Sequence, residues 1–523
     1  MDILIQGLQS LPIGTLFFIS SLLLFLLGLV FRSRGRKPFP PGPKGLPIIG
    51  NMTMMDQLNC RGLAKLAKQY GGIFHLRMGY LHIMVVSSPD VARQVLQVHD
   101  NVFSNRPANI ATTCLTYDRA DVAFANYGPF WRQMRKLCVM KLFSNKRAES
   151  WNSVPDLVDS TARTVAASAG TEVNIGGLVY ALTRNIVYRA AFGTSVQEKQ
   201  DEFFKILREF SKLFGAFNIA DFIPWLGWID PQGGVFNRRL AKARQSLDRF
   251  IDKIIDDHIE KKAMNNNNGS QSHAHDPQTD IVDDLIANYG EDDEVLEKFQ
   301  DSKNSIKLTR ENVKGIIMDL MFGGTETVGS AIEWTLSELL KSPEDLKKVQ
   351  KELDDVVGLE RRLEEGDLEK LIYLKCVIKE TLRLHPPFPF LLHETSEDAE
   401  VAGYYVPKKC RIMINVWAMG RDANYWDDAE AFKPSRFLKD VRDLKGNHFE
   451  YIPFGSGRRS CPAMKVSLFA LELAVGHLLH CFTWELPGGM EAGQLDMNAV
   501  FGLSASRATR LVAVPTKRIL CPL

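Results

Sequence analysis

The sequence predicts a mainly α-helical fold with a small β part, an α+β arrangement, preceded by an N-terminal transmembrane helix. Two long segments, at about 309–340 and 368–384, carry apolar residues at helical spacing. Strand-like composition occurs in short runs such as 401–406 and 411–416. At the N-terminus no charge occurs from residue 3 to residue 31, and an apolar run of this length can cross about 30 Å of hydrocarbon.

The composition is that of an ordinary globular chain. Of its 523 residues, 45% are hydrophobic and 24% are charged, which argues against intrinsic disorder. The formal net charge is +2 and no basic patch is interleaved with aromatic residues, so nothing indicates nucleic-acid binding. Eight cysteines are scattered without a Cys-x-x-Cys pair, which favours free thiols in a reducing compartment.

Residues 1–31 are expected to form a membrane anchor. The apolar core of this segment runs from Ile13 to Phe31, and its cations follow the core, between positions 32 and 37. A cleaved signal peptide, the alternative interpretation, would carry its positive charge before the core and a small-residue cleavage site after it. By the positive-inside rule, the anchor places the chain from position 32 onward in the cytosol.

A basic and proline-rich hinge is expected over residues 32–50, because its prolines fix φ and stiffen the chain. A ligand for an SH3-type domain is the alternative. The remaining residues, 51–523, are expected to form one globular domain. Within it, residues 264–305 are rich in asparagine and acidic residues and predict a solvated loop, in which His273 and His275 are expected to be exposed rather than metal ligands.

The ends of the longest helices can be predicted from local signals. Thr309 is a plausible N-cap, and the helical pattern stops at Leu340, before Pro343. At 1.5 Å per residue this helix is about 45–50 Å long, enough to cross the domain. The second helix is ended by two prolines at 386–387, and a final apolar helix begins just after Cys461. Before these helices, residues 55–260 alternate helical patterns with short strand-like runs.

Cys461 ends a glycine-rich segment, Phe-Gly-Ser-Gly-Arg-Arg-Ser-Cys, that begins at Phe454. A thiolate is a strong and soft metal ligand, and a turn with few side chains lets a large flat cofactor approach closely. Neighbouring amides and guanidinium groups favour the anionic sulfur. The segment therefore indicates a metal-ligating cysteine, with a buried structural cysteine as the alternative.

The middle of the long helix contains Gly-Gly-Thr-Glu-Thr, from Gly323 to Thr327. Each glycine costs a helix roughly 1 kcal/mol relative to alanine, so the pair requires a reason. A pocket with water against the helix would explain both the glycines and the acid–alcohol pair, Glu326 and Thr327. The alternative is a close helix crossing, with Thr327 bonded back to a carbonyl of its own helix.

The cysteine segment, Phe-x-x-Gly-x-Arg-x-Cys, resembles the ligand loop of the haem-thiolate monooxygenases, the cytochrome P-450 superfamily. The Gly-Gly-Thr-Glu-Thr segment is similar to the oxygen-activation segment of this superfamily, although Val328 stands where a second alcohol is usual. The resemblance implies a cytochrome P-450 fold in which residues 51–523 form a haem-thiolate catalytic domain. It also implies haem b with Cys461 as its iron ligand, and Thr327 and Glu326 as the catalytic residues.

Further haem contacts are implied by the same resemblance. Trp131 and Arg135 form a Trp-x-x-x-Arg pair that resembles a propionate-binding motif, joined by Arg459 and His393. Two carboxylates on an apolar ring need cationic or donor partners when they are buried. Phe454 is expected to contact the cofactor from the cysteine segment. For Trp131 alone, ordinary core packing is the alternative.

Glu380 and Arg383 are three residues apart and therefore share one helix face. Such a pair is commonly an exposed salt bridge of little energetic consequence. Here it resembles the Glu-x-x-Arg scaffold of the superfamily, with Arg436 as the third member. Ser435 stands where many members carry glutamate, so the structural triad is expected to be Glu380, Arg383 and Arg436.

Longer segments, at 127–136, 221–225, 321–328 and 391–395, resemble the plant ferulate (coniferaldehyde) 5-hydroxylases of lignin synthesis. This resemblance implies hydroxylation at ring carbon 5 of a guaiacyl phenylpropanoid, which is coniferaldehyde, coniferyl alcohol or ferulate. Oxygen would be O2, and electrons would come from NADPH through NADPH–cytochrome P-450 reductase at the endoplasmic reticulum membrane.

Three other functions remain open at this point. A monooxygenase of another phenolic class, such as flavonoids, would differ in substrate. A haem-thiolate isomerase or dehydratase would need no external electrons, and Thr327 argues against that class. A non-catalytic haem sensor would have no use for the acid–alcohol pair.

Overall fold

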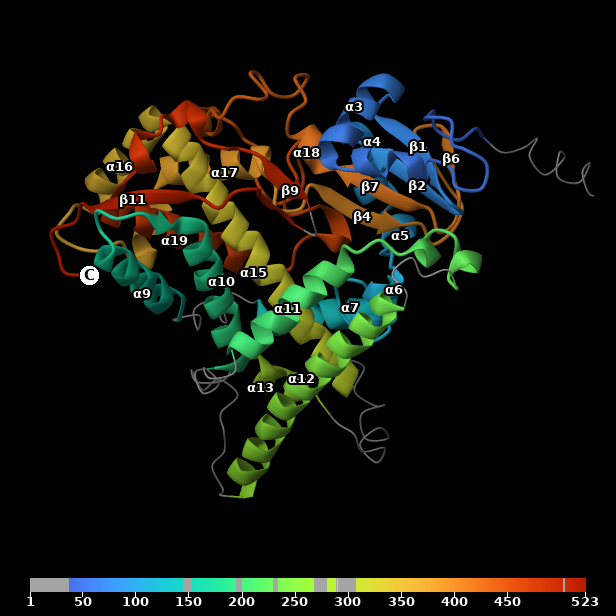
Figure 1. Cartoon of the computed structure of the whole chain (residues 1–523), viewed down its shortest axis with the longest axis horizontal. Helices are drawn as coiled ribbons and strands as arrows, with labels where there is room; N and C mark the ends of the chain where they lie inside the picture. Colours follow the sequence, from blue (N-terminus) through green and yellow to red (C-terminus); the bar gives the residue numbers. More distant parts are fainter. Residues whose placement is uncertain are drawn as a thin grey trace, which may run out of the picture.

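The computed structural model describes residues 37–143, 153–193, 200–228, 234–267, 280–287, 289, 307–501 and 504–523. A large helical part and a smaller β part lie side by side, and α15 runs diagonally through the middle of the molecule (Figure 1). The α-helices of the described residues are α3 (Cys60–Tyr70), α4 (Pro89–Arg93), α5 (Asp100–Phe103), α6 (Ile110–Leu115), α7 (Pro129–Leu137), α9 (Ser153–Ala167), α10 (Ile175–Phe192), α11 (Gln200–Phe214), α12 (Val235–Asn267), α13 (Ile281–Ile286), α15 (Arg310–Lys341), α16 (Pro343–Val356), α17 (Ile372–Leu384), α18 (Val416–Met419) and α19 (Met464–Cys481).

The strands of the described ranges form one four-stranded sheet and three smaller sheets. In the largest sheet the order is β1-β2-β7-β4, with β2 parallel to β7 and the other pairs antiparallel. The strands are β1 (Ile73–Met78), β2 (Leu81–Val86), β3 (Val173–Asn174), β4 (Phe390–Glu394), β5 (Ala399–Val401), β6 (Tyr404–Val406), β7 (Arg411–Asn415), β8 (Phe482–Glu485), β9 (Ala499–Phe501), β10 (Ala505–Arg507) and β11 (Val512–Lys517). The mainly helical prediction with a small β part is confirmed.

The long helix α15 forms for the reasons that the sequence suggested. The Thr309 side chain accepts a hydrogen bond from the backbone N–H of Asn312, and the Asn312 side chain accepts one from the backbone N–H of Thr309. The helix ends at Lys341, before Pro343, which begins α16. Most of α15 is buried in the largest hydrophobic core, which it shares with α10, α17 and α19.

Three expected elements differ from the prediction. The second helix begins at Ile372 rather than near 368, because residues 365–370 form a 3₁₀ turn. Residues 401–406 are not one strand: β5 and β6 form a hairpin that turns at Ala402 and Gly403, both with positive φ (50° and 82°). The solvated loop expected at 264–305 is wrong in part, because α13 within it buries its apolar residues in the main core.

The N-terminal anchor, the cations before position 37, and His273 and His275 lie outside the described residues. Residues 37–50 lie against the largest sheet, where the His75 N–H donates to the Pro41 carbonyl at 2.8 Å. Within the described ranges, one helix is long and apolar enough to cross a membrane, α19, with mean hydropathy 1.3. Since 67% of α19 is buried in the fold, it is a core helix here.

Candidate active site

The cysteine segment forms a tight loop that leads into α19. The Cys461 N–H donates to the Phe454 carbonyl at 2.8 Å and closes this loop. Gly457 adopts φ +68°, and a Cβ at this position would lie 2.3 Å from the Leu96 carbonyl oxygen, so only glycine fits. Ala463, where the resemblance predicts glycine, has φ −96°, a conformation that alanine adopts without strain.

Cys461 is a free thiol at partial exposure. Burial raises the pKa of its thiol, while a hydrogen bond from the Ala463 backbone and the charge of Arg135 act in the opposite direction. Because burial disfavours the anionic sulfur, a thiolate is favoured here only with a cation at its sulfur. A metal ion would meet this need.

The side chains of Arg459, in the cysteine loop, and Trp131, in α7, pack against each other. The guanidinium carbon of Arg459 lies 4.3 Å from the centre of the Trp131 ring. Both side chains donate to the Val122 carbonyl, Trp131 through Nε1 at 3.0 Å and Arg459 through Nη1 at 3.1 Å. Trp131 is buried in the main core, so it packs as a core residue and also contacts Arg459.

Three guanidinium groups meet in this region: Arg106, Arg135 and Arg459. Arg135 donates to the Ser460 carbonyl at 2.6 Å, and Arg106 donates to the Leu392 carbonyl and lies 3.5 Å from the carbonyl of Arg459. Burial lowers the pKa of all three, and the charges of Arg106 and Arg135 add to this lowering at Arg459. None of the three forms an ion pair within the described part of the chain.

Sequence reasoning missed Arg106. Its only signal was a cation in a short segment between the buried Phe103 and α6, without an acidic neighbour. His393 completes the group from β4: its Nδ1 donates to the Phe103 carbonyl at 2.8 Å. Burial and the charge of Arg106 hold the pKa of His393 well below its ordinary value, so the imidazole is neutral.

The middle of α15 faces an open space. Gly323 is exposed, and its neighbours Phe322, Glu326 and Thr327 are partly exposed, although the helix is largely buried on both sides of them. A Cβ built at Gly323 meets no described atom within 4 Å, whereas at Gly324 it would lie 2.6 Å from Val187 Cγ2 of α10. One glycine therefore borders the open space and the other permits a close helix crossing.

The acid and the alcohol of α15 have different partners. Thr327 Oγ1 donates to the Gly323 carbonyl at 2.6 Å, the bond to its own helix that was the alternative interpretation of this residue. The Glu326 carboxylate accepts hydrogen bonds from Ser211 Oγ of α11 at 3.3 Å and from Ser504 Oγ at 3.1 Å. Ser211 and Ser504 come from segments that are distant in the sequence, and of the two only Ser504 lies in a segment, 503–505, that the sequence indicated as a pocket wall.

Aromatic rings cluster at the same part of α15. Phe322 lies 5.1 Å from Phe214 and 6.0 Å from Phe210, both of α11, measured between ring centres. Phe124 stacks on Phe214 at 5.8 Å. From the sequence, pocket walls are expected at the loop 104–121, at the long helix near Phe322, at 388–392 and at 503–505. Phe322 is placed at the open space, while Leu503 lies outside the described residues.

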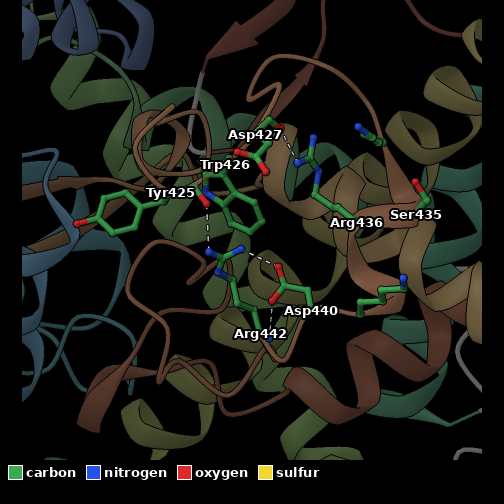
Figure 2. A pocket seen from close by; sticks show the side chains of 9 residues that line it. Tyr425, Trp426, Asp427, Ser435, Arg436, Asp440 and Arg442 are labelled. Atoms are coloured by element: carbon green, nitrogen blue, oxygen red, sulfur yellow. Dashed lines mark hydrogen bonds and ion pairs between the residues drawn. The ribbon is translucent and has the colours of Figure 1, made fainter.

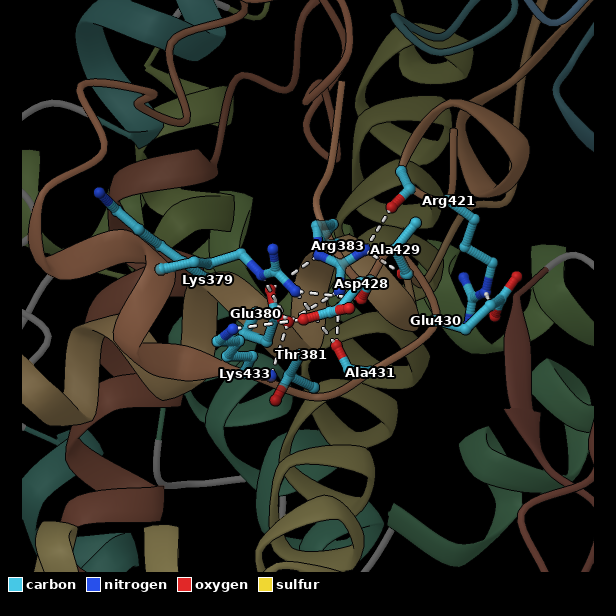
Figure 3. A network of polar contacts seen from close by, with 12 residues as sticks. Lys379, Glu380, Thr381, Arg383, Arg421, Asp428, Ala429, Glu430, Ala431 and Lys433 are labelled. Carbon is cyan, nitrogen blue, oxygen red and sulfur yellow. Dashed lines mark hydrogen bonds and ion pairs between the residues drawn. The ribbon is translucent and has the colours of Figure 1, made fainter. Parts of the chain in front are cut away.

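Glu380 and Arg383 form the buried centre of an ionic network (Figure 3). Arg436 joins this network through Glu380. Arg383 binds both oxygens of Glu380 at 2.7 Å, and neither side chain is exposed. Arg436 Nε lies 3.1 Å from Glu380 Oε1, which also accepts the backbone N–H of Lys433 at 2.8 Å. Ser435 is exposed and takes no part in the network.

Arg436 also borders a surface pocket of about 460 Å³, between Trp426, Lys439 and Arg442 (Figure 2). In this pocket Arg442 binds Asp440 at 2.6 Å. None of the residues predicted for the cofactor or for catalysis lines this pocket, and Arg436 is predicted to be structural. It belongs to the scaffold rather than to the cysteine loop.

Comparison with known proteins agrees with this architecture. The family model for cytochrome P450 matches residues 40–509. Cytochrome P450 84A1 of Arabidopsis thaliana is 63% identical over 513 residues, which cover 98% of this chain and 97% of that protein. Premnaspirodiene oxygenase of Hyoscyamus muticus is 38% identical over 483 residues, covering 92% and 93%. A solved zebra fish cytochrome P450 with progesterone has a TM-score of 0.72 at 25% identity, over 88% of this chain and 99% of that chain.

The helical fold together with the cysteine loop is typical of a class of haem-dependent oxidoreductases. The chain belongs to the cytochrome P450 family, whose model spans most of its length. It is a monooxygenase of that family, and haem is the cofactor that membership implies.

The described residues fit this group. Three crowded guanidiniums that form no ion pair within the described residues suit the two carboxylates of a haem, because those charges would relieve their mutual repulsion. The Cys461 sulfur would be a soft ligand, and the uncovered stretch of α15 leaves room for a reacting group.

Proposed function

We propose that this chain is a reductase-dependent monooxygenase that hydroxylates ring carbon 5 of guaiacyl phenylpropanoids, on the route to syringyl lignin. The observation that carries the substrate class is the aromatic cluster of Phe124, Phe210, Phe214 and Phe322 beside the open stretch of α15. Flat phenolic rings pack well against aromatic walls. The four segments that resemble ferulate 5-hydroxylases support the particular ring position.

Cys461 would hold the haem iron as a thiolate, helped by the Ala463 N–H and the Arg135 charge. Arg135 and Arg459, with Trp131, His393 and Phe454 around them, would hold the carboxylates and edges of the ring. When bound, the haem supplies the oxygen chemistry that hydroxylates the substrate. The protein contributes the pocket, its electrostatics and the exclusion of bulk water.

Thr327 and Glu326 would deliver protons to the open space. The Thr327 hydroxyl now donates to the Gly323 carbonyl, and rotation about χ1 turns the same proton toward the space in front of Gly323. The two serine hydroxyls hold the Glu326 carboxylate at the edge of this space, from which it can pass protons through water.

The electrons would come from NADPH through a membrane-bound flavoprotein reductase. Arg132 and Lys136 of α7 are exposed, next to the half-buried Arg135, and offer cations to an acidic partner. The uncharged N-terminal segment and the cations that follow it support a single-pass anchor in the endoplasmic reticulum, with the catalytic domain in the cytosol. The triad Glu380, Arg383 and Arg436 would be structural.

The test is a microsomal assay with the reductase, NADPH and a panel of coniferaldehyde, coniferyl alcohol, ferulate and representative flavonoids. We expect 5-hydroxylated guaiacyl products that require NADPH and the reductase. Cys461→Ala should lose both the products and the thiolate spectrum of the carbon-monoxide adduct. Turnover of flavonoids alone would move the substrate to another phenolic class, and turnover without electrons would indicate an isomerase.

A further inference from the structure

The loop that follows α6 has a strained backbone. Tyr117, Asp118 and Arg119 are three successive non-glycine residues with positive φ, at 56°, 58° and 66°. This left-handed conformation is unfavourable for residues with a side chain and persists where the surroundings hold it. The loop must therefore be fixed by contacts beyond its own sequence.

Two carboxyl groups provide the contacts. Asp319 of α15 accepts hydrogen bonds from the backbone N–H groups of Val122 and Ala123 at its Oδ2, at 2.7 and 3.0 Å. Asp121 is fully buried and accepts the Phe124 N–H at 3.2 Å. Asp121 directly precedes Val122, whose N–H binds Asp319, so the two carboxyl groups lie close enough to interact with each other.

A hydrogen bond between two carboxyl groups needs a proton, because carboxylate oxygens only accept. Burial and the neighbouring Asp319 raise the pKa of Asp121 well above its ordinary value. Burial also raises the pKa of Asp319 to about 6, although its amide donors and Arg459 act against this.

The other groups that face the pair do not titrate near neutral pH. Arg459 of the cysteine loop stays cationic, and burial raises the pKa of Cys138, which follows α7, to about 12. Asn312 of α15, which donates to the Ala120 carbonyl at 3.0 Å, is a neutral amide. The pair itself is therefore the titrating unit.

We propose that Asp121 and Asp319 form a proton-dependent clamp that positions the Phe124 loop over the substrate space. With one shared proton, the loop is held on α15 and the Phe124 ring packs on Phe214. Without the proton, two adjacent carboxylates repel each other and release the loop. Both aspartates are positioning residues. The identity of the substrate that Phe124 would contact rests on the proposed function.

The pH dependence has a definite sign. In the open loop both carboxyl groups are solvated, with pKa values near ~4. Opening at neutral pH therefore releases one proton, and the opening equilibrium constant rises by up to about tenfold per pH unit. This rise continues until the pH reaches the raised pKa of the closed pair, so the clamp is tightest in acid.

Asp121→Asn is the matched variant. The new amide donates to Asp319 through Nδ2 and accepts the Phe124 N–H through Oδ1, so every hydrogen bond is kept and no proton is left to lose. Asp319→Ala removes the acceptor of two backbone amides and should leave the loop poorly protected at every pH.

The experiment measures hydrogen exchange of the Val122, Ala123 and Phe124 amides in the haem-loaded full chain, between pH 6 and 8, corrected for the chemical exchange rate. We expect protection to fall by up to about tenfold per pH unit in the parent protein and to stay level in Asp121→Asn. Equal slopes in the two proteins, or a level parent, would overturn the clamp.

Kinetics separate this proposal from the proposed function. For the guaiacyl substrate, KM should rise with pH in the parent protein and stay level in Asp121→Asn. The pH profile of kcat should be the same in the two proteins. If the chain prefers another substrate, the exchange slope still appears. If guaiacyl turnover is found without an exchange slope, the clamp alone is refuted.

Discussion

Alanine at Gly323 and alanine at Gly324 should differ in their effect on stability, although the two positions are adjacent in α15. Replacing glycine in a helix interior gains roughly 1 kcal/mol at either position. At Gly323 the new methyl meets no described atom within 4 Å, so the gain is kept. At Gly324 it would lie 2.6 Å from Val187 Cγ2, and overpacking of this kind costs about 1–3 kcal/mol.

The propensity gain is common to both variants, so Gly324→Ala should be about 1–3 kcal/mol less stable than Gly323→Ala. Urea unfolding of the haem-loaded protein in detergent, followed by circular dichroism, measures this difference. Gly323→Ala should also raise KM at unchanged haem content, because its methyl enters the space that Thr327 borders. A Gly324→Ala protein as stable as Gly323→Ala would refute the assignment of open space to one glycine and helix crossing to the other.

Three more outcomes are expected. Thr327→Ala should divert oxygen to peroxide while haem stays bound, and Thr327→Ser should restore most of the product per NADPH; an alanine variant with the parent yield would remove the proton-delivery role. Glu380→Gln should destabilise the fold by about 3–5 kcal/mol, since the buried Arg383 loses its only counter-charge among the described residues; an unchanged urea midpoint would contradict this. At His258, burial lowers the pKa, but the hydrogen bond at 2.9 Å and the charge of Asp280 outweigh it and raise the pKa above its ordinary value. This contribution to stability is fully present below about pH 6.5 and is lost as pH rises through the raised pKa, so the urea midpoint should fall over that range in the parent but not in Asp280→Asn.

Local signals in the sequence were enough to predict α15. Its apolar period, its N-cap at Thr309 and its end before Pro343 all depend on residues within a few positions of one another. The same holds for the turn that closes around Cys461, where the glycines report a backbone that other residues cannot adopt. These features could be read without knowing the fold.

Features made by distant residues could not be predicted in this way. Helix α13 has six residues in a polar stretch, and only its contacts with the main core make it a buried helix. The hairpin at 401–406 was missed because a two-residue turn does not interrupt the apolar pattern. Arg106 and the carboxyl pair of Asp121 and Asp319 acquire their roles from segments that meet only after folding.

The Glu380 network has a consequence for the synthesis of this chain. Glu380 and Arg383 are made before the segment around Arg436 that completes their pairing, and the cysteine loop is made later still. In a nascent chain that ends between these segments, the charged side chains of Glu380 and Arg383 lack their partner segment. The ionic network therefore cannot form a stable buried scaffold. With Cys461 as the proposed iron ligand, haem would be captured only near the end of translation, and a stop codon before position 461 would leave a colourless polypeptide.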